Sequence, residues 1–109
     1  MKKQENHLFE ATYDISDKDW RIIRSMLRVV LRQSDTVRKS KNVTEAIKNI
    51  TREEDRIVFF KYFISGQSIV NISLEQYFSI ESVKKYLKRG TKDFVASYNK
   101  GALGNLFIE

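Results

Sequence analysis

The chain has 109 residues, enough for one small domain, and a net charge of +6 at neutral pH. It contains no cysteine, which excludes disulfides, thiolate metal sites and a cysteine nucleophile. The single histidine, His7, cannot by itself build a transition-metal site or a catalytic triad, so we expect no enzyme, metal or cofactor. Because proline is absent and there are only four glycines, little interrupts long helices, and the composition predicts an all-α fold.

Residues 1–14 mix charged and scattered apolar side chains without a sustained period, and we expect them to form a tail. Two lysines near the start are not followed by the apolar stretch of an export signal. No run approaches the roughly 18 apolar residues that a membrane-spanning helix needs. The expected location is therefore the cytoplasm, without a membrane partner.

The first predicted helix covers residues 17–37 and starts at Ser16 or Asp17, because a capping side chain and early acids suit the positive end of the helix dipole. Its apolar residues fill an arc wider than half of a helical wheel, whereas a surface helix needs a stripe of about 100°. The helix is therefore either central or shared with a partner, for example in a homodimer. The arc contains Trp20, Ile22, Ile23, Met26, Leu27, Val29, Val30, Leu31 and Val37.

Four arginines recur along the polar side of this helix at steps of three, four and four residues, and predict an exposed basic ridge. Guanidinium groups suit DNA phosphates and acidic protein surfaces equally well. The same spacing also fits a solvated amphipathic face, so both interpretations stay open. The basic ridge consists of Arg21, Arg24, Arg28 and Arg32.

Residues 38–42, RKSKN, are polar and cationic and are typical of a linker. We therefore assign residues 15–42 to an N-terminal amphipathic helix and its linker. A short helix is predicted over residues 43–50, with Asn42 or Thr44 as its cap.

A further helix start is indicated by the capping-box pair of Thr51 and Glu54. The acidic run 53–55 is explained by the positive end of the helix dipole. This helix is apolar on nearly all sides and should end at Ser65-Gly66, since glycine readily takes the left-handed conformation at helix ends. We expect it in the centre of the domain.

The final pair of helices has the layout of a helix-turn-helix, with a short apolar segment at residues 69–78 followed closely by a longer helix. Ser79 has the right chemistry for an N-cap, so this second helix should start at Ile80. One face of it is predicted to pack, with Val83, Leu87, Gly90 and Phe94 at helical spacing.

The roughly opposite face of that helix carries Glu81, Lys85, Lys88, Arg89 and Lys92, and the stretch from Lys84 to Lys92 contains five cations and no acid. Cations neutralise phosphates without reading sequence, while polar side chains near the helix start reach base edges. The predicted reading end consists of Ser79, Glu81, Ser82, Lys84 and Lys85. The predicted contacts nearer the DNA backbone are Lys88, Arg89 and Lys92. The alternative is a solvated helix face.

The run from Phe78 to Arg89, FSIESVKKYLKR, resembles the recognition half of the helix-turn-helix in the fourth conserved region of bacterial sigma factors, with Ser82 where they have threonine. The span from about residue 50 to Tyr98 is similar to phage-encoded regulators of the ArpU and late-operon-activator type. The resemblance implies a sigma-region-four-like DNA-binding domain, here residues 43–98, and control of transcription at promoters.

The sequence thus predicts a small all-α regulator that binds double-stranded DNA and acts beside RNA polymerase, with residues 99–109 as a C-terminal tail. The alternative is a protein-interaction module, an adaptor or anti-activator, that uses the apolar N-terminal helix. A full sigma factor would have to fit its promoter-melting part into the first fifty or so residues, which the length argues against. Binding of duplex DNA with a steep salt dependence separates the first two hypotheses.

Overall fold

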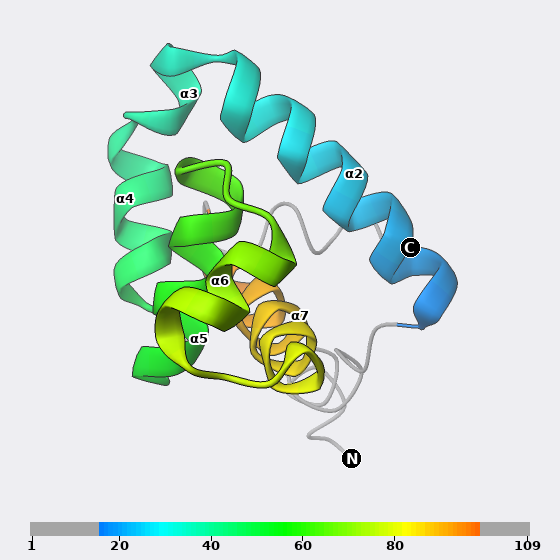
Figure 1. The fold of residues 1–109 in the computed structure, drawn as a ribbon. Coiled ribbons are helices and arrows are strands. Elements are labelled where there is room, and N and C mark those ends of the chain that lie inside the picture. Colours follow the sequence, from blue (N-terminus) through cyan, green and yellow to red (C-terminus); the bar gives the residue numbers. More distant parts are fainter. Residues whose placement is uncertain (1–15, 99–109) are drawn as a thin grey trace.

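A computed structural model describes residues 16–98, and the two predicted tails lie outside these described residues. Every regular element in this range is helical, which confirms the small all-α domain (Figure 1). The elements are α2 (Asp17–Gln33), α3 (Asp35–Arg38), α4 (Lys41–Lys48), α5 (Glu53–Phe59), η1 (Phe60–Ile64), α6 (Ile69–Gln76) and α7 (Ile80–Ser97). None of these described helices is both long and apolar enough to cross a membrane.

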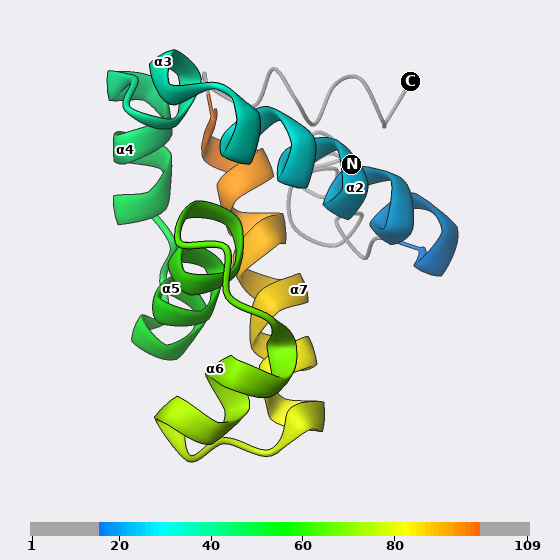
Figure 2. The same cartoon turned by 45° about the horizontal axis from the view of Figure 1, so that its top comes forward.

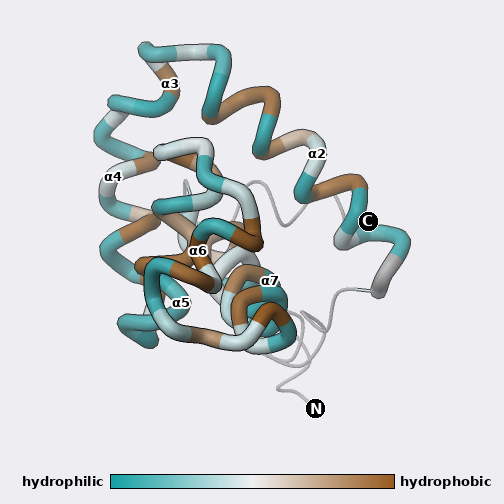
Figure 3. The backbone as a smooth tube through the Cα atoms, viewed as in Figure 1, coloured by the Kyte–Doolittle hydropathy of each residue, from teal (hydrophilic) through white to brown (hydrophobic). Residues whose placement is uncertain are grey.

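Helix α7 runs through the middle of the domain, with α4 and α5 on one side, α2 on another and α6 at one end (Figure 2). Helix α5 makes the most extensive contact with it, and its continuation η1 also supports α2. The packed face predicted for α7 is confirmed, because Val83 and Leu87 are fully buried and Phe94 is 1% exposed. Hydrophobic and hydrophilic segments alternate along α2 (Figure 3).

Aromatic rings form the centre of the core. The ring centroid of Phe59 lies 4.7 Å from that of Phe63 and 4.7 Å from that of Phe94. Tilted and offset ring pairs of this kind stabilise a core by about 0.5–1.5 kcal/mol beyond the area they bury. They join α5, η1 and α7 into one unit, on which the other helices pack.

The predicted continuous helix over residues 17–37 is wrong, because the chain leaves the helix at Ser34. This residue is extended, with φ −121° and ψ 106°, and its hydroxyl accepts a hydrogen bond of 3.2 Å from a backbone N–H of α3. Serine side chains compete in this way with the helical backbone. Arg38 closes the corner by donating to the carbonyl oxygens of Leu31 (3.3 Å) and Arg32 (3.1 Å). The chain then turns so that α4 can pack on α7.

The predicted linker over residues 38–42 is partly helical, since α4 begins at Lys41. Its cap is Ser40, whose hydroxyl accepts a 3.2 Å hydrogen bond from a backbone N–H in the first turn. The predicted caps, Asn42 and Thr44, lie inside the helix instead.

Helix α5 begins at Glu53, close to the predicted start, but the capping box is wrong. Its N-cap residue is Arg52, which makes no side-chain capping bond. Thr51 instead donates its backbone N–H to the carboxylate of Asp93 in α7, at 3.1 Å. The carboxylate of Asp93, on another helix, therefore accepts the Thr51 N–H that the Glu54 carboxylate was predicted to accept within the same helix.

The apolar helix widens into the π-helical segment η1 and ends, as predicted, before Gly66, which has φ +77°. The N–H of Ser65 donates to the carbonyl oxygen of Phe60 at 3.0 Å, five residues back. The wider turn lets the neighbours Tyr62 and Phe63 both point into the core, while Phe60 stays 45% exposed. Such insertions in a helix are often found at functional sites.

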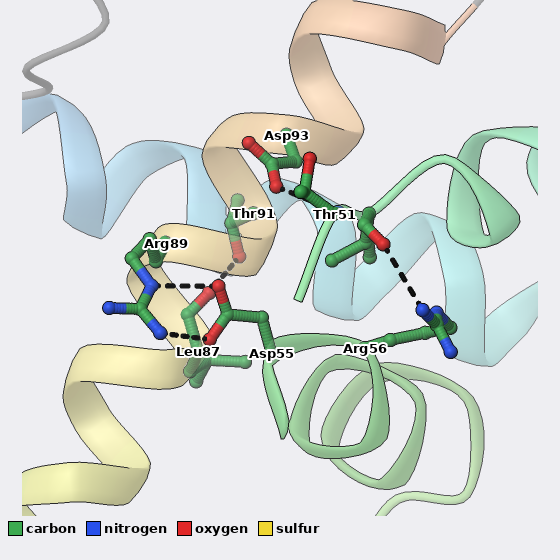
Figure 4. A network of polar contacts seen from close by, with 8 residues as sticks. Thr51, Asp55, Arg56, Leu87, Arg89, Thr91 and Asp93 are labelled. Atoms are coloured by element: carbon green, nitrogen blue, oxygen red, sulfur yellow. Dashed lines mark hydrogen bonds and ion pairs between the residues drawn. The ribbon is translucent and has the colours of Figure 1, made fainter. Parts of the chain in front are cut away.

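A buried ion pair fastens α5 to α7 (Figure 4). The carboxylate of Asp55 is fully buried and accepts from Nε and Nη2 of Arg89, at 2.8 and 2.9 Å. The hydrogen bond to Asp55 raises the pKa of Arg89, against the opposing effect of burial. The guanidinium therefore keeps its charge beside the Asp55 carboxylate.

We expect Arg89→Ala to lower the free energy of unfolding by about 3 kcal/mol or more, because it leaves the Asp55 carboxylate buried without a partner. Denaturant melts of the variant and the parent chain measure the loss. The matched control is Lys85→Ala, which removes an exposed cation from the same helix. Equal losses in the two variants would contradict a structural role for the pair.

Candidate nucleic-acid interface

Helices α6 and α7 are joined by the three residues 77–79, the connection length of a helix-turn-helix. Each helix has a serine cap: Ser68 Oγ accepts a backbone N–H at 3.0 Å in α6, and Ser79 Oγ accepts that of Ser82 at 3.0 Å in α7. The predicted start of α7 at Ile80 is confirmed. These local bonds hold the first turn of α7 in place.

The Ser79 and Ser82 hydroxyls are also paired with each other. Ser79 Oγ donates to Ser82 Oγ at 2.9 Å while it accepts the backbone N–H of Ser82. Ser79 is thus occupied with capping, whereas Ser82 only accepts in this pair of hydroxyls and keeps its own proton for another acceptor. Of the two predicted reading serines, Ser82 is the better placed to donate to a base.

The N-terminal half of α7 presents a polar surface to solvent. Glu81, Lys84 and Lys85 are exposed, as predicted, and Lys88 and Lys92 are half-buried further along the helix. The candidate interface therefore consists of Glu81, Ser82, Lys84, Lys85, Lys88 and Lys92. Lys85, Lys88 and Lys92 lie on the side of α7 away from Val83 and Leu87, and Lys84 lies on the flank between the two sides.

Arg89 is placed differently from the other predicted cations. Its guanidinium is turned toward α5 and neutralises Asp55, as described above. We therefore remove Arg89 from the candidate interface. Asp55 was missed because an acid in the first turn of a helix is expected to be solvated there, and nothing in its neighbourhood in the sequence marks it as buried.

The turn between the two helices contains an unusual residue. Tyr77 has φ 60° and ψ 33°, in the left-handed region, and is 94% exposed. This conformation costs a residue with a Cβ about 1–2 kcal/mol and is normally taken by glycine. Its neighbour Phe78 packs instead, with its ring 5.1 Å from that of Tyr86. Because the ring of Tyr77 is exposed, it contributes little to the core, and its packing does not offset the cost of the left-handed backbone.

The basic ridge on α2 is exposed only in part. Arg21 and Arg28 are exposed, whereas Arg24 and Arg32 are half-buried. The guanidinium carbons of Arg24, Arg28 and Arg32 lie 5.9, 5.7 and 5.5 Å from the ring centroid of Tyr62. Arg32 also donates to the carbonyl oxygen of Tyr62 at 2.8 Å. Much of the ridge thus packs against η1, so the prediction that the whole ridge is exposed is wrong.

The apolar arc of α2 is not fully covered by the described part of the chain. Ile23, Leu27 and Leu31 are buried, but Ile22 is 49%, Val29 54% and Val30 39% exposed; we call these last three the apolar flank. We predicted that this arc is covered either within the domain or across a homodimer. Residues 16–98 alone do not cover it. In this same range, no three acidic or histidine side chains are arranged to hold a metal ion.

The sequence matches no protein-family model, and comparison with curated proteins and with solved structures returned no significant match.

We expect Tyr77→Gly to raise the free energy of unfolding by up to about 1 kcal/mol, because glycine takes the left-handed conformation without strain. Denaturant melts measure the difference. The matched control is Tyr77→Ala, which removes the same ring but keeps a Cβ on the left-handed backbone, and should bring no gain. Stabilisation by alanine equal to that by glycine would show that the ring, rather than the backbone, is unfavourable.

Proposed function

We propose that the protein is a cytoplasmic helix-turn-helix regulator of transcription that binds double-stranded promoter DNA through α7, beside RNA polymerase. One observation carries the proposal: a capped helix of 18 residues, packed along one side, presents exposed cations on its other side, next to its N-terminus. A helix held in this way can enter the major groove, which is wide enough for it.

The side chains of the candidate interface supply both kinds of DNA contact. Lys84 and Lys85 neutralise phosphates and contribute affinity that depends on salt. Glu81 accepts from the amino group of cytosine, and Ser82 donates to base-edge acceptors. Helix α6, which precedes the turn, takes the place of the helix that crosses the DNA backbone in such motifs.

The assignment to promoters is supported by the resemblance of residues 78–89 to the recognition half of sigma region four. In this chain, Ser79 of that run caps α7, and its apolar residues Val83 and Leu87 are buried. Among regulators with this resemblance, the phage-encoded ArpU and late-operon-activator type is the class that we propose.

A second candidate function is protein association through α2. It is favoured by the apolar flank, Ile22, Val29 and Val30, because exposed apolar side chains grouped on one helix often mark a protein contact. A second copy of the chain is one such partner, since two-fold dimers are the commonest assemblies and suit paired DNA half-sites. An adaptor or anti-activator would use the same flank without binding DNA.

The affinity for mixed-sequence duplex DNA should fall steeply with salt, and Lys85→Ala should reduce the slope of log affinity against log salt by about one unit. Fluorescence anisotropy of a labelled duplex at several salt concentrations measures both. The matched control is Lys48→Ala, which removes an exposed cation from α4 and should leave the slope unchanged. If the parent chain binds no duplex, the second candidate function is favoured instead.

Glu81→Ala should relax sequence preference while it preserves or raises affinity for unrelated DNA, because a carboxylate selects cytosine but repels phosphates. Selection of bound sequences from a random duplex pool measures the preference, and anisotropy on one unrelated duplex measures the affinity. A uniform loss of binding to all sequences, with an unchanged melt, would contradict a reading role for Glu81.

A further inference from the structure

A pocket of about 290 Å³ lies between the N-terminal half of α2 and the start of the α6–α7 pair. Among the described residues, its lining combines three apolar side chains with three cations and no acid. The apolar ones are Trp20, Ile69 and Leu87, and the cations are Arg21, Arg24 and Lys84.

No described residue of the lining supplies a counter-charge to these three cations. Leu87 is fully buried and Trp20 and Ile69 are half-buried, so part of the wall is apolar. Like charges near an apolar wall repel more strongly than they would in bulk water. An anion in the pocket relieves this repulsion and is attracted by the summed field of the three cations.

The two arginines are placed to bind such an anion. Arg24 is half-buried, and its guanidinium carbon lies 5.9 Å from the ring centroid of Tyr62, a cation–π contact that restricts its movement. Arg21 precedes it by three residues on α2 and is exposed, so its side chain can reach a ligand in the pocket. Planar guanidinium groups bind the oxygens of a phosphate in pairs, which a lysine cannot do.

Lys84 connects the pocket to the candidate interface, because it belongs to both. It follows the buried Val83 and is exposed on the flank of α7 that faces α2. A duplex that lies against Lys84 and Lys85 therefore passes the mouth of the pocket. DNA backbone carries a phosphate at every nucleotide, so a duplex in this position always has one to offer.

We infer that the pocket binds a backbone phosphate of the same duplex that α7 reads. The inference rests on the proposed function and extends the contact surface from α7 to α2. A phosphate held by Arg21, Arg24 and Lys84 provides a second fixed point beside the groove. Phosphate contacts of this type set the register and orientation of a reading helix without reading bases themselves.

The only tryptophan of the chain, Trp20, lines the pocket and gives a direct test. A short duplex is titrated into the full chain at constant salt while tryptophan emission is recorded with selective excitation. We expect emission to change with the same midpoint as the anisotropy of the labelled duplex. Arg21→Ala should remove most of the emission change and reduce the salt slope by about one unit.

Two further variants make the test specific. Arg28→Ala removes another exposed arginine of α2 that does not line the pocket, and should leave both the emission change and the slope as in the parent chain. Arg21→Lys keeps the charge but loses the paired N–H groups, so it should keep the slope while it weakens affinity. Thermal melts of all variants confirm that each is folded.

The outcomes separate the pocket from the proposed function. If Arg21→Ala behaves like Arg28→Ala while Lys85→Ala still reduces the slope, the pocket inference is overturned and DNA binding by α7 stands. If no duplex binds, both fall. Inorganic phosphate and a polyglutamate peptide serve as further probes. An emission change with either of them that Arg21→Ala removes, without any response to duplex, would identify another anion as the ligand and overturn the assignment to DNA.

Discussion

The contact between α5 and α7 decides which side of α7 faces solvent. A buried carboxylate is tolerated only with a partner, so Asp55 requires Arg89 to point toward α5. Gly90 lets the two backbones approach, because a Cβ there would lie 2.9 Å from the carbonyl oxygen of Asp55. Charge and shape together thus fix the rotation of α7 about its axis. With that rotation, Lys84 and Lys85 point outward, and the candidate interface is a consequence of the packing beneath it.

The features of α7 that the sequence predicted are those encoded within the helix itself. Its start depends on Ser79, which caps a backbone N–H only three residues on, and its buried face depends on a period of 3.6 residues. A helical wheel treats all cations alike, so the sequence predicts Arg89 among the phosphate contacts. Its acid lies 34 residues away in the sequence, and the contact of Thr51 with Asp93 spans 42. No local pattern contains such partners.

Two other differences between the predicted and the observed helices have physical causes that a regular spacing of apolar residues does not reveal. The break at Ser34 depends on a side chain that competes with the helical backbone, and on Arg38, which binds the freed carbonyl oxygens. The π-helical turn of η1 places Tyr62 against α2, where arginines predicted to be exposed contact its ring. Gly90 was a usable signal, since a glycine inside a helix costs about 1 kcal/mol relative to alanine and implies a close approach. It indicates a helix crossing but does not identify the partner.

Helix α2 carries two kinds of surface that point in different directions. At about 100° per residue, the apolar flank of Ile22, Val29 and Val30 lies on one side of the buried stripe, and Arg21 and Arg24 lie on the other, beside α7. A protein that covers the apolar flank would therefore leave the cationic pocket open to a phosphate. DNA binding and protein association are then compatible properties of one helix. Only if α7 binds no DNA do the two functions exclude each other. The pocket would then have no duplex beside it, whereas the exposed apolar flank could still be buried by a protein partner.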